Sequence, residues 1–228
     1  MLAVLEAKYN FKSKIMNKPL ISVIIPAYNE ANYIVNCLDS LANQIHSPEH
    51  EIIVCDNGST DGTVELVKNH KLKPRLVIES TRGVANARQA GLEVAQGEII
   101  VSTDADCLFK TNWLEKIEIQ FKDKTVVGVA GNYHFMNAPL WARVLPYLGS
   151  VLVWLIYIVT KKTIYASAAN LSFRKKYTNG YSLLETQGSD ERGIIKQLVK
   201  NGRVKVILKT RFIHRLDEFV KVSFMVFL

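Results

Sequence analysis

The sequence lacks the signatures of several common kinds of site. Its three cysteines, Cys37, Cys55 and Cys107, are odd in number and form no CxxC pair. This usage argues against a disulfide framework or a cysteine-rich zinc site and is typical of a protein kept in a reducing compartment. The chain also has no GxxxxGK[ST] loop and no GxGxxG after its first apolar run, which argues against a P-loop nucleotidase and a standard dinucleotide site.

Strong clusters of like charge are also missing, although the chain is basic. The 228 residues have a formal net charge of +8 and a pI near 9.3, which favours an anionic partner such as a nucleotide or a phospholipid surface. No run of five or more like charges forms a nucleic-acid-binding arm, so we expect no nucleic-acid partner.

The amino-terminal residues do not have the pattern of a signal peptide. Residues 1–18 contain four lysines but no apolar core followed by a small-residue cleavage site. We expect them to form a poorly ordered or helical leader. We also expect the protein to be cytoplasmic, either free or at the cytoplasmic face of a membrane.

Short apolar runs alternate with segments of helical periodicity over the first 130 residues. Strands are expected at 20–25 (ending at Pro26), 51–55, 75–79, 98–102 and 126–130, and helices at 30–43, 63–70, 83–95 and 113–121. Gly97 is expected to close the third of these helices. The alternation predicts an α/β fold with a mostly parallel central sheet that helices cover on both faces.

Polar residues follow three of the predicted strands. The segments are Pro26–Glu30, Asp56–Ser59 and Asp104–Asp106. Ligands of open parallel sheets bind outside the carboxyl ends of the strands, so we expect the three segments to form one binding site. With no glycine-rich phosphate loop, the acidic residues favour hydrogen bonds to a base or ribose and a diphosphate held by a metal ion.

Asp104 and Asp106 are the most informative pair of residues in the sequence. On an extended chain, carboxylates two residues apart point to the same side. At about 6 Å and an effective dielectric of about 20 they repel by about 3 kcal/mol, so they need a proton, a cation or a basic partner. Mg²⁺ or Mn²⁺ would suit two carboxylates. The alternative is a solvated acidic turn before the helix at 113–121.

The second part of the chain, residues 131–215, contains an uncharged apolar stretch at 144–160, bracketed by Arg143 and Lys161-Lys162. Seventeen helical residues span about 25 Å, less than the roughly 30 Å of a hydrocarbon core. The stretch is therefore expected to be an interfacial element or a core segment, with a membrane span as the third reading. The apolar tail 216–228 could dock on this surface, touch a bilayer, or continue in a longer chain.

Four blocks of the sequence resemble, in order, the family-2 glycosyltransferases with the GT-A fold. The blocks are 23–30 (VIIPAYNE), 56–63 (DNGSTDGT), 83–91 (GVANARQAG) and 104–106 (DAD). The match covers about residues 20–130 closely and 165–205 more loosely. The resemblance implies a nucleotide-sugar-binding subdomain at 19–130, followed by an acceptor-side region at 131–215 that carries the catalytic base.

The resemblance also implies roles for individual residues. The first turn, with Pro26, Ala27, Tyr28 and Glu30, would hold the base and ribose together with Asp56. Asp104 would lie near the ribose and the metal, and Asp106 would bind the metal directly. Arg82 or Arg88 could neutralise the diphosphate, although Arg88 could equally be a cation on the helix surface. His214 could reach the metal; otherwise it is a surface residue.

The later blocks match the family less closely. Residues 168–175 (AANLSFRK) resemble the segment that approaches the donor sugar and acceptor. Asp190 aligns with the family's catalytic aspartate, but Ser189 replaces the usual glutamate before it. Glu191 is therefore a competitor for the role of base, and Glu185 a more distant one. Ser189-Asp190 could also simply cap the helix that follows.

The resemblance implies an inverting, metal-dependent glycosyltransferase that uses Mn²⁺ or Mg²⁺. Its donor would be a nucleoside-diphosphate sugar, with a UDP-sugar favoured over a GDP-sugar, and its acceptor is unknown. The basic charge and the apolar stretch make a lipid-linked or polysaccharide acceptor and a peripheral membrane contact plausible. The alternatives are a sugar-phosphate nucleotidyltransferase and a non-catalytic nucleotide-sugar-binding module.

Overall fold

A computed structural model describes residues 19–136, 139–160, 163, 167–182, 190–208 and 212–215. The expected leader 1–18, the tail 216–228, Glu185 and Ser189 lie outside the described residues. The expectations for these segments therefore stay predictions.

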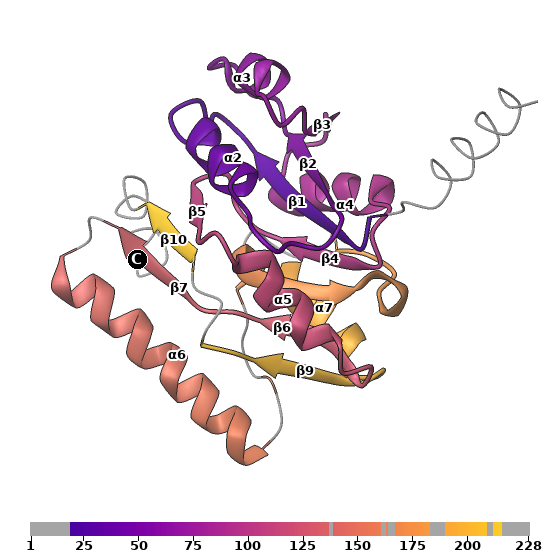
Figure 1. Ribbon diagram of the computed structural model, residues 1–228, viewed down its shortest axis with the longest axis vertical. Helices are drawn as coiled ribbons and strands as arrows, with labels where there is room; N and C mark the ends of the chain where they lie inside the picture. The colour runs from indigo at the N-terminus through magenta and orange to yellow at the C-terminus, as the bar shows by residue number, and fades with distance from the viewer. Residues whose placement is uncertain are drawn as a thin grey trace, which may run out of the picture.

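The centre of the molecule is a seven-stranded sheet with the strand order β3-β2-β1-β4-β8-β6-β9 (Figure 1). Its strands are β1 (Ile21–Ala27), β2 (His50–Asp56), β3 (Arg75–Ile78), β4 (Ile99–Ser102), β6 (Val126–Ala130), β8 (Leu171–Arg174) and β9 (Arg203–Val206). All neighbours pair in parallel except β8, which runs antiparallel to β4 and β6. The prediction of a mostly parallel α/β sheet is confirmed.

Helices cover both faces of this sheet because the strands alternate apolar side chains between two cores. The helices are α2 (Ile34–Ala42), α3 (Thr63–Asn69), α4 (Val84–Val94), α5 (Trp113–Phe121), α6 (Leu140–Thr160) and α7 (Asp190–Leu198). Ile21, Val23 and Ile25 of β1 share one core with α2 and α5. Ile24 belongs to the other core, with residues of α4, α6 and α7.

A second, three-stranded sheet has the order β5-β10-β7. It consists of β5 (Cys107–Phe109), β7 (Tyr133–Met136) and β10 (Phe212–Arg215). β10 pairs antiparallel with β5 and parallel with β7, which brings the end of the described chain back beside the Asp104–Asp106 segment. None of these three strands is among the strands predicted from the sequence.

β6 and β8 are neighbours in the sheet although forty residues, 131–170, separate them in the chain. Ala130 pairs with Leu171, and the Gly131 amide donates to the Asn170 carbonyl at 2.9 Å. The 3-10 turns η1 (Ala168–Asn170) and η2 (Lys175–Tyr177) flank β8. Because β8 is antiparallel, it begins at the edge where β1, β2 and β4 end.

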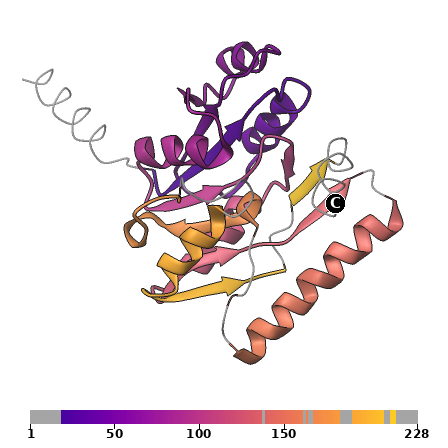
Figure 2. The same cartoon turned by 180° about the vertical axis from the view of Figure 1, so that it is seen from behind.

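The apolar stretch 144–160 forms most of α6, a single helix that begins at Leu140 and continues through Pro146 and Gly149. α6 contacts β7 and β9, and Figure 2 shows it along one margin of the molecule. Among the described residues, none of the helices combines the length and the apolar character that a membrane crossing needs.

Three details of the predicted elements are wrong. The helix expected at 30–43 is α2, which begins only at Ile34. β1 does not end at Pro26, because Pro26 and Ala27 stay in register with Cys55 and Asp56. Gly97 does not close α4, which ends at an extended Ala95. A Cβ on Gly97 would lie 2.6 Å from the Ser22 backbone nitrogen, so this glycine permits the close approach of β1.

Candidate functional site

A cleft of about 470 Å³ opens at the edge where β1, β2 and β4 end, a volume within the range of small-ligand sites. All three predicted segments reach it, although Asp56 and Asp106 themselves are not among the residues that line it. Its lining comprises Pro26, Ala27, Tyr28, Glu30, Asn57, Arg82, Gly83, Val84, Ala87, Asp104 and Ala105.

The turn after β1 is fastened to the turn after β2. The amide of Asn29, a residue with a positive φ of 57°, donates to Ser59 Oγ at 2.9 Å. Asn29 Oδ1 accepts from the Thr60 amide at 2.8 Å, and the Glu30 amide donates to Thr63 Oγ1 at 2.8 Å. These bonds make the two segments one wall of the cleft and orient Tyr28 and Glu30 within it.

Asp56 ends β2 and is 2% exposed. Its Oδ2 accepts from the amides of Gly58 and Ser59, at 3.0 and 3.1 Å. Its buried Oδ1 has no hydrogen-bond partner among the described residues. A buried carboxylate oxygen left without a partner costs free energy, so this atom is suited to accept a hydrogen bond from a ligand.

Asn57 holds the loop that carries Arg82, a function that the sequence reasoning missed. Its Nδ2 donates to the carbonyls of Glu79 and Thr81 at 2.9 and 2.8 Å, and its Oδ1 accepts from the Gly83 amide at 2.7 Å. Asn57 is 5% exposed, so these bonds are shielded from water. The only signal in the sequence was its position directly after Asp56.

Arg82 forms the outer wall of the cleft with Tyr28. Its guanidinium carbon lies 3.8 Å from the centroid of the Tyr28 ring, and Nη2 donates to the Tyr28 hydroxyl at 2.6 Å. Nη1 donates to the Asn57 carbonyl at 2.9 Å. The cation is exposed and fixed at the cleft, where an anionic ligand can reach it.

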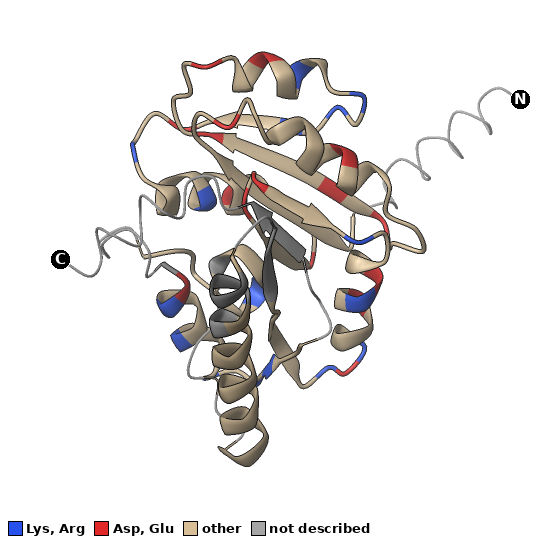
Figure 3. Cartoon of the chain, turned by 90° about the vertical axis from the view of Figure 1, so that its left-hand side faces the viewer, with Lys and Arg blue, Asp and Glu red and all other residues tan. Residues whose placement is uncertain are grey.

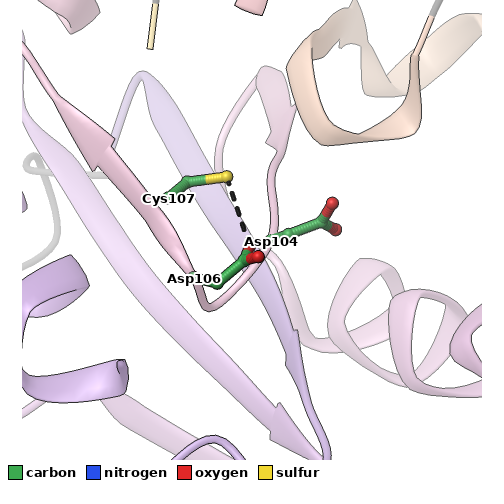
Figure 4. A group of neighbouring side chains, drawn as sticks. All are labelled: Asp104, Asp106 and Cys107. Atoms are coloured by element: carbon green, nitrogen blue, oxygen red, sulfur yellow. Dashed lines mark hydrogen bonds between the residues drawn. The ribbon is translucent and has the colours of Figure 1, made fainter. Parts of the chain in front are cut away.

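Asp104 and Asp106 do not lie on an extended chain, contrary to the prediction. β4 ends at Ser102, and the chain turns at 104–106, where the Cys107 amide donates to the Asp104 carbonyl at 3.4 Å. The turn, and not an extended strand, brings one oxygen of each carboxylate within 4.8 Å of the other. Figure 4 shows the Asp104 carboxylate directed away from Cys107, with that of Asp106 beside the thiol.

Arg88 on α4 supplies the basic partner of Asp104. Its Nη2 lies 2.6 Å from Asp104 Oδ1, and its side chain is 5% exposed. The alternative of a cation on the helix surface is therefore wrong. The pair offsets the negative charge at Asp104 and reduces its repulsion of Asp106.

The acidic turn offers oxygen ligands for a hard cation. One oxygen of each carboxylate and the Cys107 sulfur lie within 4.8 Å of one another. Burial, together with the charges of Asp104 and Asp106, raises the pKa of the Cys107 thiol well above its usual value, so the sulfur keeps its proton. The carboxylates thus fit Mg²⁺ or Mn²⁺, whereas a protonated thiol is a poor metal ligand.

The remaining predicted residues come from the last described elements. His214 is opposite Cys107 in the β10–β5 register, so the backbone brings it to the acidic turn. Asp190 is the first residue of α7, and Glu191 follows it with 7% exposure. α7 is linked to α4 through segment 178–182, since Gln197 bonds to Asn179 and Gly180, and Gln89 accepts from the Tyr181 amide.

Part of this sequence is similar to that of known proteins. Glycosyltransferase GlyG of Streptococcus pneumoniae serotype 4 is 35% identical over 119 residues, which are 50% of this chain and 39% of that protein. The chain thus spans about two fifths of that relative.

Two solved structures have the same fold. The mannosyltransferase PcManGT from Pyrobaculum calidifontis, in complex with GDP-Man and Mn²⁺, has a TM-score of 0.68 and 26% identity, over 87% of this chain and 57% of that one. S. aureus TarS 1-349 in complex with UDP has a TM-score of 0.70 and 20% identity, over 89% and 62%. The model of the family described as Glycosyl transferase family 2 matches residues 22–179, so this chain belongs to that family.

Proposed function

We propose that this chain is an inverting, metal-dependent glycosyltransferase that moves a sugar from a nucleoside-diphosphate sugar to an acceptor hydroxyl. The observation that supports the proposal is the convergence of three polar turns on one cleft, whose lining includes Tyr28, Asn57, Arg82 and Asp104. Membership of Glycosyl transferase family 2 supports the reaction class.

The base of the donor would bind at Asp56. The pairing edge of uracil offers one N–H between two carbonyls, whereas guanine offers two N–H donors side by side. Asp56 has one oxygen available, Oδ1, because Oδ2 already accepts two backbone amides. This asymmetry favours a UDP-sugar over a GDP-sugar, although PcManGT was solved with GDP-Man.

Tyr28, with 45% of its surface exposed, offers a ring face to the base or ribose beside Pro26 and Ala27. Glu30 accepts hydrogen bonds from sugar hydroxyls on the same wall. With the base and ribose placed there, Arg82 would bind the diphosphate. Arg88 acts instead by holding Asp104, since its guanidinium is buried against that carboxylate.

Asp106 and Asp104 would hold a divalent cation, Mn²⁺ or Mg²⁺, with His214 as the third candidate ligand. Asp106 is the first choice because Asp104 is already paired with Arg88. A bound cation supplies positive charge that stabilises the departing diphosphate.

Asp190 is our candidate for the base. It accepts the proton of the acceptor hydroxyl as that oxygen attacks the anomeric carbon and the bond to the diphosphate breaks. Attack from the face opposite the leaving group inverts the configuration and needs no covalent intermediate. Glu191 is the second candidate, but its burial limits its access to an acceptor.

The acceptor is proposed to be lipid-linked or a growing polysaccharide, and the protein is proposed to act in the cytoplasm or at the cytoplasmic face of a membrane. The apolar helix α6 and the basic net charge support a peripheral membrane contact. A nucleic-acid partner is not proposed.

A thermal-shift screen of UDP- and GDP-sugars with Mn²⁺ tests the donor site. We expect a UDP-sugar to raise the melting temperature with Mn²⁺ but not with EDTA, and Asp106→Asn to abolish the difference. Asp123→Asn is the matched control, because it removes an aspartate that pairs with Arg203 on the surface.

Two outcomes would support other functions. Stabilisation by nucleoside triphosphates, with release of pyrophosphate from the triphosphate when a sugar phosphate is added, would support a nucleotidyltransferase. Donor binding with neither transfer nor hydrolysis would support a binding module.

A further inference from the structure

The helix α6 has an apolar outer face. Six aliphatic side chains on it are between 40% and 82% exposed: Val144, Leu148, Leu152, Leu155, Ile158 and Val159. At 100° per residue these positions fall within an arc about 120° wide. We call them the α6 stripe. From Val144 to Val159 it runs for about 22 Å along the helix.

The opposite face of α6 is fixed to the rest of the molecule. Tyr157 is 7% exposed, and Val153 and Trp154 pack against the core that contains α4 and α7. Ser150 Oγ donates to Asn132 Oδ1 at 2.9 Å. The helix therefore cannot rotate to bury the α6 stripe without giving up these contacts.

A helix that is apolar on both faces is usually buried in a larger core or in lipid. α6 is instead at the margin of the molecule in both Figure 1 and Figure 2. Contiguous apolar patches of more than a few hundred Å² are uncommon on soluble monomers, and they mark interaction surfaces.

The charges around the α6 stripe indicate the partner. From Thr125 to Leu184 the sequence contains no aspartate or glutamate but six lysines and arginines. In the sequence Arg143 precedes the stripe and Lys161-Lys162 follow it, while residues 144–160 of α6 include no charged residue (Figure 3). An apolar strip with basic residues at both ends is complementary to acyl chains beneath anionic headgroups.

The tail 216–228 contains Asp217 and Glu218 beside Lys221, so the iodide measurement described below, and not its charge, separates it from a bilayer. The same charges argue against a second copy of the chain as the occupant. A second copy aligned antiparallel would bring Arg143 against Lys161-Lys162, and a parallel copy would place each basic end against itself. We propose that the α6 stripe lies in the interface of an anionic lipid bilayer and holds the protein on its surface; this rests on the peripheral membrane contact in the proposed function and assigns that contact to one surface.

Vesicle flotation with the full 228-residue chain tests the proposal. The probes are vesicles of phosphatidylcholine alone and of phosphatidylcholine mixed with phosphatidylglycerol. We expect binding to the anionic vesicles, and at least a tenfold loss of it in the double variant Leu148→Glu/Leu152→Glu. The matched control is Ile119→Glu/Val199→Glu, which alters two aliphatic residues of similar exposure, 47% and 50%, elsewhere on the surface. The control should bind like the unmodified protein.

A second measurement introduces no charge into the helix. A fluorophore is attached to the cysteine of the variant Leu152→Cys. Its emission should shift to the blue when anionic vesicles are added, and iodide should quench it when they are absent. Protection from iodide without vesicles would overturn the proposal in favour of the tail. A dimer that the double glutamate variant turns into a monomer would overturn it in favour of a second copy. Equal vesicle binding by the variant and the unmodified protein would also overturn it. Donor binding is measured separately, so failure here does not bear on the proposed transfer.

Discussion

Arg88 Nη2 and Asp104 Oδ1 lie 2.6 Å apart, and this ion pair joins the helix α4 to the acidic turn after β4. The Arg88 side chain is 5% exposed and that of Asp104 30%. The pair thus balances a charge that would otherwise repel Asp106, and it fixes the direction of the Asp104 carboxylate.

We expect Arg88→Met to destabilise the protein by about 2–3 kcal/mol, which lowers the melting temperature by about 5–10 °C, because Asp104 loses its partner in a partly buried position. The double variant Arg88→Met/Asp104→Asn should recover part of the loss. Denaturant unfolding of both single variants and the double variant measures the coupling. If the two single substitutions changed the free energy of unfolding additively in the double variant, a direct interaction between Arg88 and Asp104 would be contradicted.

Asn57→Asp should raise the dissociation constant of the UDP-sugar at least tenfold. The change replaces two N–H donors with an oxygen that repels the Glu79 and Thr81 carbonyls, and this loosens the loop that holds Arg82. Isothermal calorimetry with Mn²⁺ measures the effect. The control is Asn201→Asp, which changes an exposed asparagine bonded to the Gln197 carbonyl. Equal affinities in both variants would exclude this role for Asn57.

Asp190→Asn should leave donor binding unchanged and reduce transfer by at least about a hundredfold, since general-base catalysis contributes about that much. Glu191→Gln should retain most of the activity. Turnover of a UDP-sugar with a panel of acceptors, including lipid-linked ones, provides the measurement. The opposite pattern would assign the base to Glu191.

Asp61 should make stability sensitive to acid. Desolvation by its neighbours raises the pKa of its carboxyl group, but hydrogen bonds from Thr63 Oγ1 at 2.5 Å and from the Ala31 and Thr63 amides outweigh this and lower the pKa below the ordinary value of an aspartate. The folded protein therefore binds this proton less readily than the unfolded chain. The stabilisation is present above about pH 4 and is lost as the pH falls through the folded pKa.

Asp61→Asn should accordingly lower the melting temperature by a few degrees at pH 6, because hydrogen bonds to a charged carboxylate are stronger than those to a neutral amide. The difference between variant and unmodified protein should shrink toward pH 3, where both lack the charge. Scanning calorimetry between these two values checks the sign. A gap that widens toward acid would refute the assignment.

Much of the fold between residues 20 and 130 was predictable, because the local sequence pattern and the tertiary packing agree there. The apolar runs at 21–25, 52–55 and 126–130 are buried strands, and Trp113–Phe121 is a helix with the expected bounds. The three polar segments meet at one edge because parallel strands end on the same side.

The sequence was less informative where structure depends on distant partners. β8 has four residues, too few for a periodic signal, and it is a strand because β4 and β6 bond to it on both sides. The local sequence around Arg88 is equally consistent with a surface cation. Its partner Asp104 is sixteen residues away in the chain, and only the fold brings the two together. Asn57 resembles an ordinary turn residue, because its partners follow more than twenty residues later.

The hydrogen bond between the Gly131 amide and the Asn170 carbonyl closes the base of the segment 131–170. Both ends of this segment are held by the β6–β8 ladder, while its own elements pack on the rest of the molecule: β7 pairs with β10, and Tyr157 of α6 lies in the core with residues of α4 and α7. In evolution, and in protein engineering, the segment can therefore be exchanged only for one that pairs with β10 and fills the same core. Within that limit, the exposed face of its helix can vary independently of the cleft where β1, β2 and β4 end.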